Sequence, residues 1–422
     1  MALRLFEGFG VELEYMLVHA DSLDVLPATD QVILAVAGDF IAEVERGTLA
    51  WSNELVNHVI ELKTNGPAAQ LRGLDEVFAR DVVEILGLLR PLGGRLMPTA
   101  AHPWMDPARE TTLWSHEEYN EVYEAFDRIF GVRGHGWANL QCVHLNIPFY
   151  GDAEFARLHA AMRLLLPIIP ALAASSPILD GRLTGLMDSR MHFYRENTKK
   201  IPSITGKVIP EPVYSKREYE ETILGRMYAD IAPHDPEETL RDEWLNARGA
   251  IARFDRSAIE IRIIDIQECP TADFAIMHAI TCVLRALVEE RWQPAERQQG
   301  FDTDALNAVL LDTTRHAEEA AIHDAGYLAA FGLHASPVKA GELWQHLVET
   351  VVAPDADFSD SWSAAIRIIL DEGTLARRIA RAVTAERPAA PARTGLERDA
   401  LHRVYGTLCD CLKWNRGFHA TP

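Results

Sequence analysis

Four short segments of the chain alternate between apolar and polar residues, which is the pattern of β-strands with one buried face. They cover residues 10–15, 58–64, 142–148 and 258–265. Since residues two apart in a strand share a face, the apolar positions predict contact with a core and the polar positions predict a second, wet face. We expect the four strands to join in one sheet, whose wet face would carry Glu12, Glu14, Glu61, Lys63, His144, Asn146, Glu260 and Arg262.

Helical periodicity fills most of the chain between and after these strands. Strands that lie far apart in the sequence and are separated by helices predict an α+β fold with a largely antiparallel sheet. A capping box, Ser115 and Glu118, is expected to open the second helix, and a mobile linker is expected at 387–393. The predicted helices cover residues 71–90, 115–131, 152–166, 271–292, 303–323, 340–352, 360–371, 374–385 and 396–413.

The dominance of glutamate on the wet face suggests chemistry beyond solvation. Any one of these strands alone fits a sheet that exposes one face to water. Four are harder to explain in that way, because a solvated face normally mixes lysine, threonine, serine and glutamine with its acids. Carboxylates that close together cannot all stay ionised without compensating cations. Divalent metal ions with oxygen ligands, together with phosphate, are the usual solution, so the pattern predicts a catalytic site.

Composition narrows the class of protein. The 422 residues are 48% hydrophobic and 24% charged, as in an ordinary globular enzyme, and the net charge of −21 argues against a nucleic-acid-binding surface. The five cysteines form no Cys-x-x-Cys pair, which fits a reducing cytosol. The apolar run 164–174 is broken by prolines and is too short to span a bilayer. We expect a soluble cytoplasmic protein with no nucleic-acid or membrane partner, and a homo-oligomer is compatible with the sequence.

Two loop segments carry basic residues whose role the pattern leaves open. Residues 175–190 are rich in turn-forming residues and include Arg190, which suits a carboxylate or phosphate, although a plain connection after a buried helix fits equally. Residues 199–207 place Lys199 and Lys207 near a glycine without the spacing of a P-loop. A lid over a triphosphate and an exposed loop are both consistent with this segment.

The order of several short motifs resembles the glutamate–cysteine ligase family, closest to its bacterial type-2 and carboxylate–amine ligase-like branch. The resemblance covers residues 10 to about 285, with a weaker echo at 371–378. Each motif is loose, but their order and spacing together are specific. They are Gly10-Val-Glu-Leu-Glu14, Glu54 followed by Glu61-Leu-Lys-Thr64, His102-Pro, Val-His144, Ser175-Ser-Pro followed by Asp180-Gly and Thr184-Gly, and Ile259-Glu-Ile-Arg262.

The resemblance implies a fold similar to glutamine synthetase, in which a curved antiparallel sheet holds ATP and Mg²⁺, with Mn²⁺ as an alternative ion. It implies a catalytic domain at 1–295 and a helical region at 296–422 packed on it. Arg262 and Glu260 match catalytic positions, with Arg262 beside the transferred phosphate. The implied metal ligands are Glu12, Glu14, Glu61, His144 and Glu260, and the implied substrate or nucleotide contacts are Glu54, Asn57, Thr64, Asn146, Arg190, Lys199 and Lys207.

The activity implied is ATP-driven amide formation from a carboxylate and an amine through an acyl phosphate, most simply the joining of glutamate to cysteine. One motif departs from the branch: where it reads His-Val-His-Val-Gly, this chain has Cys142-Val-His-Leu-Asn146. That difference leaves open a ligase with another acid and amine. A phosphotransferase similar to guanidino kinases, or a binding protein that has lost catalysis, would also fit the sequence.

Overall fold

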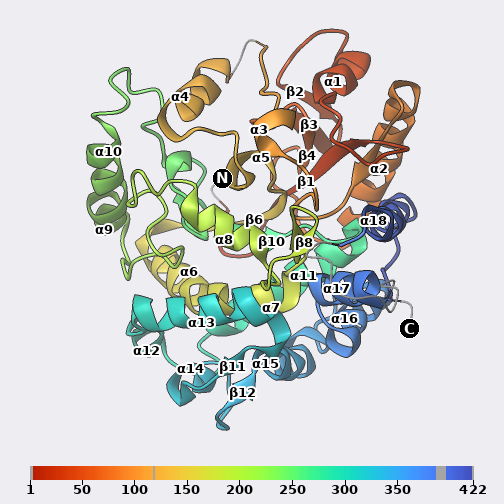
Figure 1. Ribbon diagram of the computed structural model, residues 1–422. Coiled ribbons are helices and arrows are strands. Elements are labelled where there is room, and N and C mark those ends of the chain that lie inside the picture. The colour runs from red at the N-terminus through yellow and green to blue at the C-terminus, as the bar shows by residue number, and fades with distance from the viewer. Residues whose placement is uncertain (1–2, 117–118, 386–395, 421–422) are drawn as a thin grey trace.

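Figure 1 shows a computed structural model of the protein, which describes residues 3–116, 119–385 and 396–420. Within these residues an eight-stranded sheet has the order β2-β3-β4-β1-β6-β10-β9, and β5 also pairs with β1. Every ladder between these strands is antiparallel. The strands are β1 (Gly10–His19), β2 (Glu43–Arg46), β3 (Leu49–Asn53), β4 (Val59–Thr64), β5 (Gly94–Met97), β6 (Cys142–Pro148), β9 (Ala250–Arg253) and β10 (Ala258–Asp265).

The prediction that four alternating segments share one sheet is confirmed, because β4, β1, β6 and β10 are consecutive neighbours. Their register aligns the polar positions across the strands. Glu14 lies opposite Glu61, and Glu12 lies opposite His144. Glu260 lies opposite Asn146 on the next ladder. One face of the sheet therefore collects the acidic side chains from three strands.

The other face of the sheet packs against helices α2 (Leu74–Leu89), α6 (Gly151–Leu165) and α11 (Pro270–Val288). Val11 and Leu13 of β1 are fully buried in this core. The three helices present apolar side chains to the sheet, as their periodicity requires. Because Val11 and Leu13 face the helices, the glutamates that alternate with them in β1 must point to the opposite face of the sheet.

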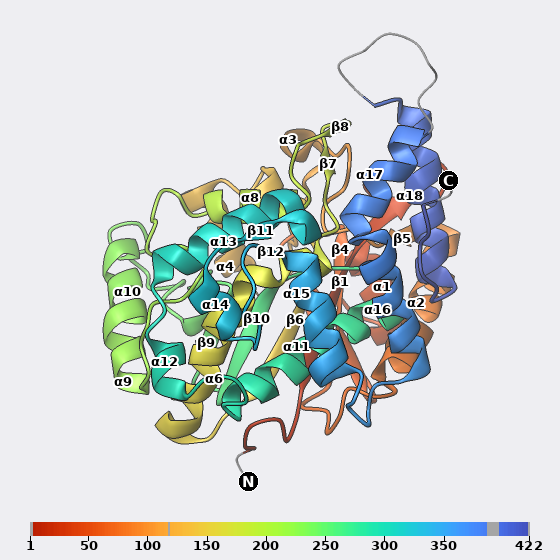
Figure 2. The same cartoon turned by 90° about the horizontal axis from the view of Figure 1, so that it is seen from below.

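The remaining helices surround this arrangement (Figures 1 and 2), and the mixed fold with a largely antiparallel sheet is confirmed. Two small antiparallel sheets pair β7 (Ile178–Leu179) with β8 (Arg182–Leu183) and β11 (Ala321–Ile322) with β12 (Val338–Lys339). The helices are α1 (Thr29–Ala37), α3 (Pro107–Glu110), α4 (Asn120–Phe130), α5 (His135–Ala138), α7 (Pro170–Ala173), α8 (Ser189–Glu196), α9 (Lys216–Tyr219), α10 (Gly225–Ile231), α12 (Ala295–Gln299), α13 (Thr303–His316), α14 (Ala325–Ala329), α15 (Ala340–Leu347), α16 (Asp360–Glu372), α17 (Leu375–Ala385) and α18 (Arg398–Lys413).

Several predicted helix ends are wrong. The helix expected at 303–323 ends at His316, because Ala317 takes a positive φ of 51° and the chain then enters β11. The helix expected from 115 begins only at Asn120. Its proposed cap Glu118 and the linker at 387–393 lie outside the described residues. The helix expected to reach 292 ends at Val288.

Helix α11 is long and apolar enough to cross a membrane, with a mean hydropathy of 1.5. However, 89% of its apolar window is buried inside the structure. Phe274 on α11 packs against Phe78 on α2, with ring centroids 5.3 Å apart. The apolar composition of α11 is thus accounted for by its place in the core, where nearly every face of the helix meets another element.

Helices α17 and α18 lie side by side at one side of the molecule, and α9 and α10 lie at the opposite side (Figure 2). A second apolar cluster joins α18 to the sheet through Leu408, Met16 of β1 and Met97 of β5. Arg378 of α17 also forms a fully buried ion pair with Glu268, at 2.7 Å. The C-terminal helices are therefore held by apolar packing on the sheet and by a buried charge pair with the segment between β10 and α11.

Candidate active site

The polar face of the sheet gathers four glutamates from two strands and the loop that joins β3 to β4. Carboxylate oxygens of Glu14, Glu54 and Glu61 lie within 4.8 Å of one another. Glu12 and Glu61 form a second such group with a ring nitrogen of His144. We call Glu12, Glu14, Glu54 and Glu61 the acidic cluster. The structure brings the predicted carboxylates Glu12, Glu14 and Glu61 together and adds Glu54, and each group could hold one metal ion. Glu260, which was also predicted as a metal ligand, belongs to neither group and pairs with Arg262 instead.

Crowding inside the acidic cluster disfavours full ionisation. Burial, together with Glu14 and Glu61, raises the pKa of Glu54 well above its ordinary value. Burial and Glu12 likewise raise the pKa of Glu61, although Lys63 opposes the shift from 3.1 Å away. Negative charges confined at this spacing attract cations. The positive side chains of the protein therefore do not balance the negative charge of the acidic cluster.

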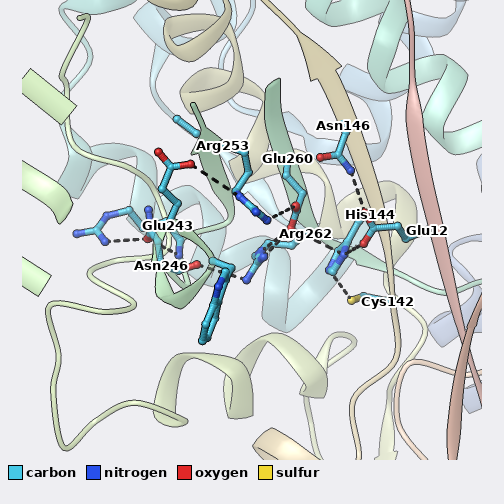
Figure 3. Close-up of polar contacts among 12 residues, drawn as sticks. Glu12, Cys142, His144, Asn146, Glu243, Asn246, Arg253, Glu260 and Arg262 are labelled. Carbon is cyan, nitrogen blue, oxygen red and sulfur yellow. Dashed lines mark hydrogen bonds and ion pairs between the residues drawn. The ribbon is translucent and has the colours of Figure 1, made fainter. Parts of the chain in front are cut away.

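His144 links the acidic cluster to β10 (Figure 3). Its Nδ1 lies 2.6 Å from Glu12 Oε2 and 3.8 Å from Glu260 Oε1. Burial opposes ionisation of Glu12, but the charge and hydrogen bond of His144 lower the pKa of Glu12 to about 2. The pKa of His144 rises well above its ordinary value despite burial, because Cys142 and Glu12 favour the charged ring. Asn146 completes this row by donating from Nδ2 to Glu12 Oε1 at 3.2 Å.

Arg262 is the cationic group that pairs with Glu260, whereas Lys63 contacts the acidic cluster itself through Glu61. Its guanidinium donates from Nη2 and Nε to Glu260 Oε1, at 2.5 and 3.1 Å. Its Nη1 donates to the Asn246 carbonyl at 3.3 Å. The β10–β6 ladder is irregular between Ile261 and Ile264, and the Arg262 amide bonds to Gly249 instead. Such irregularities re-aim side chains near functional sites.

Arg253 adds a second guanidinium near Glu260 (Figure 3). Its Nη1 lies 3.9 Å from Glu260 Oε2, and its Nη2 lies 3.1 Å from Asp255 Oδ2. Glu243 lies 3.9 Å from the same guanidinium. The site thus has two ends, one acidic around Glu61 and one with arginines around Glu260, which suits a ligand that bridges cations and phosphate.

The other predicted site residues differ in where their side chains lie. Glu54 and Asn146 belong to the site, and Thr64 Oγ1 accepts a hydrogen bond from the Val11 amide at 3.2 Å. Asn57 instead binds the start of α1, where its Oδ1 accepts the Asp30 amide at 3.0 Å.

The three predicted basic contacts also make their interactions away from the acidic cluster. Arg190 is 1% exposed, and it donates to Asp265 Oδ1 at 3.3 Å and to the Arg262 carbonyl at 2.6 Å. Lys199 and Lys207 are exposed, and Lys207 pairs with Asp304 of α13. Arg190 therefore supports Arg262 through its main chain, whereas the two lysines contact neither Glu260 nor the cluster in the described hydrogen bonds.

The sequence pattern missed Ser52 and Arg253 as contributors to the site, and it marked Cys142 only as a departure from the family motif. Ser52 donates from Oγ to Glu61 Oε1 at 2.7 Å, but its strand has no alternation that would have marked it. The Cys142 thiol lies 3.3 Å from Glu14 Oε1 and 3.2 Å from His144 Nε2. Arg253 is the last residue of β9 and lies opposite Ala258 of β10. A hairpin predicted before β10 was the one sequence signal that could have placed Arg253 near Glu260.

Comparisons with known proteins identify the family and several relatives of this chain. The model of the family described as glutamate–cysteine ligase family 2 matches residues 8–405. A protein of Archaeoglobus fulgidus without a functional name is 36% identical over 67% of this chain and 75% of its own length. A protein of Bradyrhizobium sp. (strain ORS 278), provisionally named glutamate–cysteine ligase 2, is 26% identical over 74% of this chain and 76% of its own length.

Solved structures share the fold at low sequence identity. The glutamate–cysteine ligase of Francisella tularensis, crystallised in complex with AMP, has a TM-score of 0.59 and 10% identity, and the match covers 97% of this chain and 90% of that chain. A bifunctional glutathione synthetase from Pasteurella multocida has a TM-score of 0.58 and 13% identity, over 97% of this chain and 52% of that chain. With the family match extending over nearly all of the sequence, the chain belongs to glutamate–cysteine ligase family 2 and is a ligase.

Proposed function

We propose that the protein is an ATP- and Mg²⁺-dependent carboxylate–amine ligase that joins the γ-carboxylate of glutamate to an amine such as cysteine. The observation that carries the proposal is the acidic cluster facing the Glu260–Arg262 pair across His144. Carboxylates suit divalent cations and guanidinium groups suit phosphate, so the two halves together suit a metal–nucleotide complex. The family match supports a glutamate–cysteine ligase type of reaction.

The donor set of the acidic cluster fits Mg²⁺. Magnesium prefers carboxylate oxygens and binds through a few of them while keeping waters. Glu14, Glu54 and Glu61 form one group of oxygens, and the oxygens of Glu12 and Glu61 form a second group beside a ring nitrogen of His144. The raised pKa values of Glu54 and Glu61 are the physical sign that the cluster lacks positive charge. Bound Mg²⁺, or Mn²⁺ in its place, would neutralise phosphate charge during transfer.

The proposed reaction has two steps. The γ-carboxylate oxygen attacks the γ-phosphorus of ATP, which breaks the bond to the bridging oxygen and releases ADP, and leaves an acyl phosphate. The amine nitrogen then attacks the acyl carbon, loses a proton and displaces phosphate to give the amide. The first step is needed because a carboxylate is a poor electrophile. Both steps depend on positioning and charge stabilisation rather than on a protein nucleophile.

Arg262 is the residue that would stabilise the phosphoryl group during transfer. Although burial opposes its charge, Glu260 raises the pKa of Arg262, so the guanidinium stays protonated. Its two bonds to Glu260 fix the plane of the guanidinium before the substrate arrives. A preorganised cation of this kind contributes roughly 10²–10³ to the rate of a transfer step. Glu260 therefore acts by orienting Arg262 beside the acidic cluster.

The experiment is to incubate the protein with Mg-ATP, glutamate and a panel of amines that includes cysteine, while phosphate release is measured and the amide is identified by mass spectrometry. Phosphate should be released only when ATP, Mg²⁺, acid and amine are all present. Glu260→Gln should abolish release, and Arg262→Lys should lower kcat by roughly 10²–10³. Arg256→Ala is the matched control, because Arg256 is an exposed arginine of the same hairpin.

Two outcomes would contradict the proposal. A phosphorylated product that forms without any amide would identify a phosphotransferase. Nucleotide binding without turnover by the folded wild-type protein, with every amine in the panel, would identify a binding protein. If amide forms with an amine other than cysteine, the ligase chemistry stands and the acceptor is corrected. Cys142 and Asn146 are the first residues to exchange in that case, because both lie beside His144 (Figure 3).

A further inference from the structure

A second group of metal-ligating side chains lies outside the acidic cluster, on helix α11 and the segment before α16. His278 and Cys282 are four residues apart on α11, so they share one face of the helix. Asp355 approaches them from the segment that follows a π-helical turn at Val348–Val352. One ligand atom from each of the three residues lies within 4.8 Å of the other two. The group is therefore already assembled.

The distances in this group match those between neighbouring ligands of one metal ion. His278 Nε2 lies 3.4 Å from Cys282 Sγ and 3.5 Å from Asp355 Oδ1. In a tetrahedral zinc site with bonds of about 2.0–2.3 Å, ligand atoms are roughly 3.3–3.7 Å apart. Without a cation, His278 Nε2 either carries a proton and donates to Asp355 or accepts from the Cys282 thiol, but it cannot do both at once. A cation placed among the three atoms would satisfy all of them.

The surroundings of His278 fix its ring in this position. The imidazole is stacked on Phe358, with ring centroids 5.6 Å apart and planes 7° apart, and it also packs against Trp362. Asp355 is held by the Asp357 amide, which donates to Oδ1 at 2.9 Å. Outer contacts that orient ligands in this way are typical of metal sites. The Asp355 side chain is 22% exposed, whereas that of His278 is 7% exposed, so the site has an entry from solvent.

The donor set selects the class of metal. Nitrogen, sulfur and carboxylate oxygen together favour Zn²⁺ over Mg²⁺, which prefers oxygen alone. Burial lowers the pKa of His278, which keeps the imidazole in the neutral form that binds metals. Burial and Asp355 raise the pKa of Cys282 to about 12, so a metal must displace the thiol proton. Arg285 lies 3.8 Å from Asp355 Oδ2, so Oδ1, which also accepts the Asp357 amide, is the oxygen that faces His278.

We propose that His278, Cys282 and Asp355 bind one Zn²⁺ ion, which fastens the segment 353–359 to α11, with water in the fourth position. This site differs from the acidic cluster in its residues and in its metal. Because α11 packs on the apolar face of the sheet, the ion would act as a structural tie between the sheet and the helices that follow Asp355. It would take no part in the ligase reaction.

The test uses Zn²⁺ and Co²⁺ on the full-length protein after chelation, with millimolar Mg²⁺ present so that the acidic cluster is occupied by a hard ion. Wild-type protein should bind one equivalent of Zn²⁺ and show a rise of a few degrees in melting temperature. Co²⁺ should give the absorption of a thiolate-bound tetrahedral ion. Cys282→Ser should lose that absorption, and Asp355→Asn should weaken Zn²⁺ binding by at least about 100-fold.

Two cysteine variants serve as controls. Cys142→Ser tests the alternative thiol, which lies beside His144 and Glu14, and Cys409→Ser tests a buried cysteine of α18. Both should keep the thiolate absorption and the single equivalent of Zn²⁺. The proposal fails if wild-type protein binds no Zn²⁺, if Cys282→Ser keeps the thiolate absorption, or if Cys142→Ser removes it. Asp355→Asn is a change at a partly exposed residue, so a folded variant with unchanged affinity would equally overturn the assignment.

Discussion

At the scale of single residues, Glu54 shows what the crowding of carboxylates does to the protein. Because the pKa of Glu54 is raised, the carboxyl group of Glu54 keeps its proton to higher pH in the folded, metal-free protein than in the unfolded chain, where its pKa is near 4.5. Above that pH the folded state binds more protons than the unfolded state. The free energy of unfolding contributed by Glu54 therefore falls as the pH rises, and is fully retained only below pH 4.5.

We predict that Glu54→Gln raises the melting temperature of the metal-free protein by a few degrees near neutral pH, because the substitution removes a charge that the fold disfavours. The gain should shrink as the pH falls toward 4.5. Melting curves in a chelating buffer across this pH range measure it. Glu45→Gln, at an exposed glutamate of β2, is the control and should show no such trend. A gain that is the same at every pH would contradict the explanation.

The alternation of single residues predicted most of the acidic side of the site. Glu12, Glu14 and Glu61 could be placed together because each is flanked by apolar residues that must face the core. The contribution of Ser52 could not be predicted, since its whole strand is buried and carries no alternating pattern. The spacing also could not distinguish Arg190, which a buried carboxylate holds, from an arginine that faces a ligand.

At the scale of elements, α8 is fastened to β10 by that same arginine. Arg190 near the start of α8 meets Asp265 at the end of β10, and both side chains are at most 1% exposed. In the protein interior a charged side chain is costly unless an opposite charge lies beside it. Since Arg190 also donates to the Arg262 carbonyl, the contact fixes the strand at the residue that faces the site.

We predict that Arg190→Met lowers the free energy of unfolding by about 3–5 kcal/mol, because it leaves Asp265 charged and unpaired in the interior. Urea denaturation followed by circular dichroism measures the change. Arg195→Met, on the same helix and only half-buried, should cost far less. If Arg190→Met instead raised the KM for ATP while the stability stayed at the wild-type value, Arg190 would be a nucleotide contact.

Helices and strands were predicted best where the hydrophobic pattern ran over many residues and the two faces of the element differed in polarity. The four alternating strands and helices such as α2, α16 and α18 were found to within a few residues. The end of α13 was missed because Ala317 leaves the helix through a positive φ, which an alanine does not announce. The irregularity in β10 after Ile261 was also missed, although two successive apolar residues, Ile263 and Ile264, interrupt the alternation there.

At the scale of the whole molecule, the C-terminal helices are part of the support of the sheet. Leu408 on α18 is fully buried in the apolar cluster that contains Met16 of β1 and Met97 of β5. β1 is also the strand that carries Glu12 and Glu14. Strand β1 therefore both packs against α18 and positions two glutamates of the acidic cluster.

We predict that Leu408→Ala destabilises the protein by about 2–5 kcal/mol, because it leaves a cavity in this cluster. Loss of ligase activity and loss of helical signal should shift together to lower urea concentration. Thr407→Ala, at the neighbouring exposed position of α18, should change stability by less than about 0.5 kcal/mol. Activity that survives after the helical signal of α18 has melted would show that the two parts are independent.

The order of strands in the sheet has a consequence for the protein while it is being made. Glu12, Glu14, Glu54 and Glu61 emerge early from the ribosome, whereas Arg253 and Arg262 follow some two hundred residues later. A nascent or truncated chain that lacks β9 and β10 carries the negative charges without the guanidinium groups that oppose them. Such a fragment would repel phosphate compounds, so phosphate binding is expected only after β10 has paired with β6 and β9 with β10.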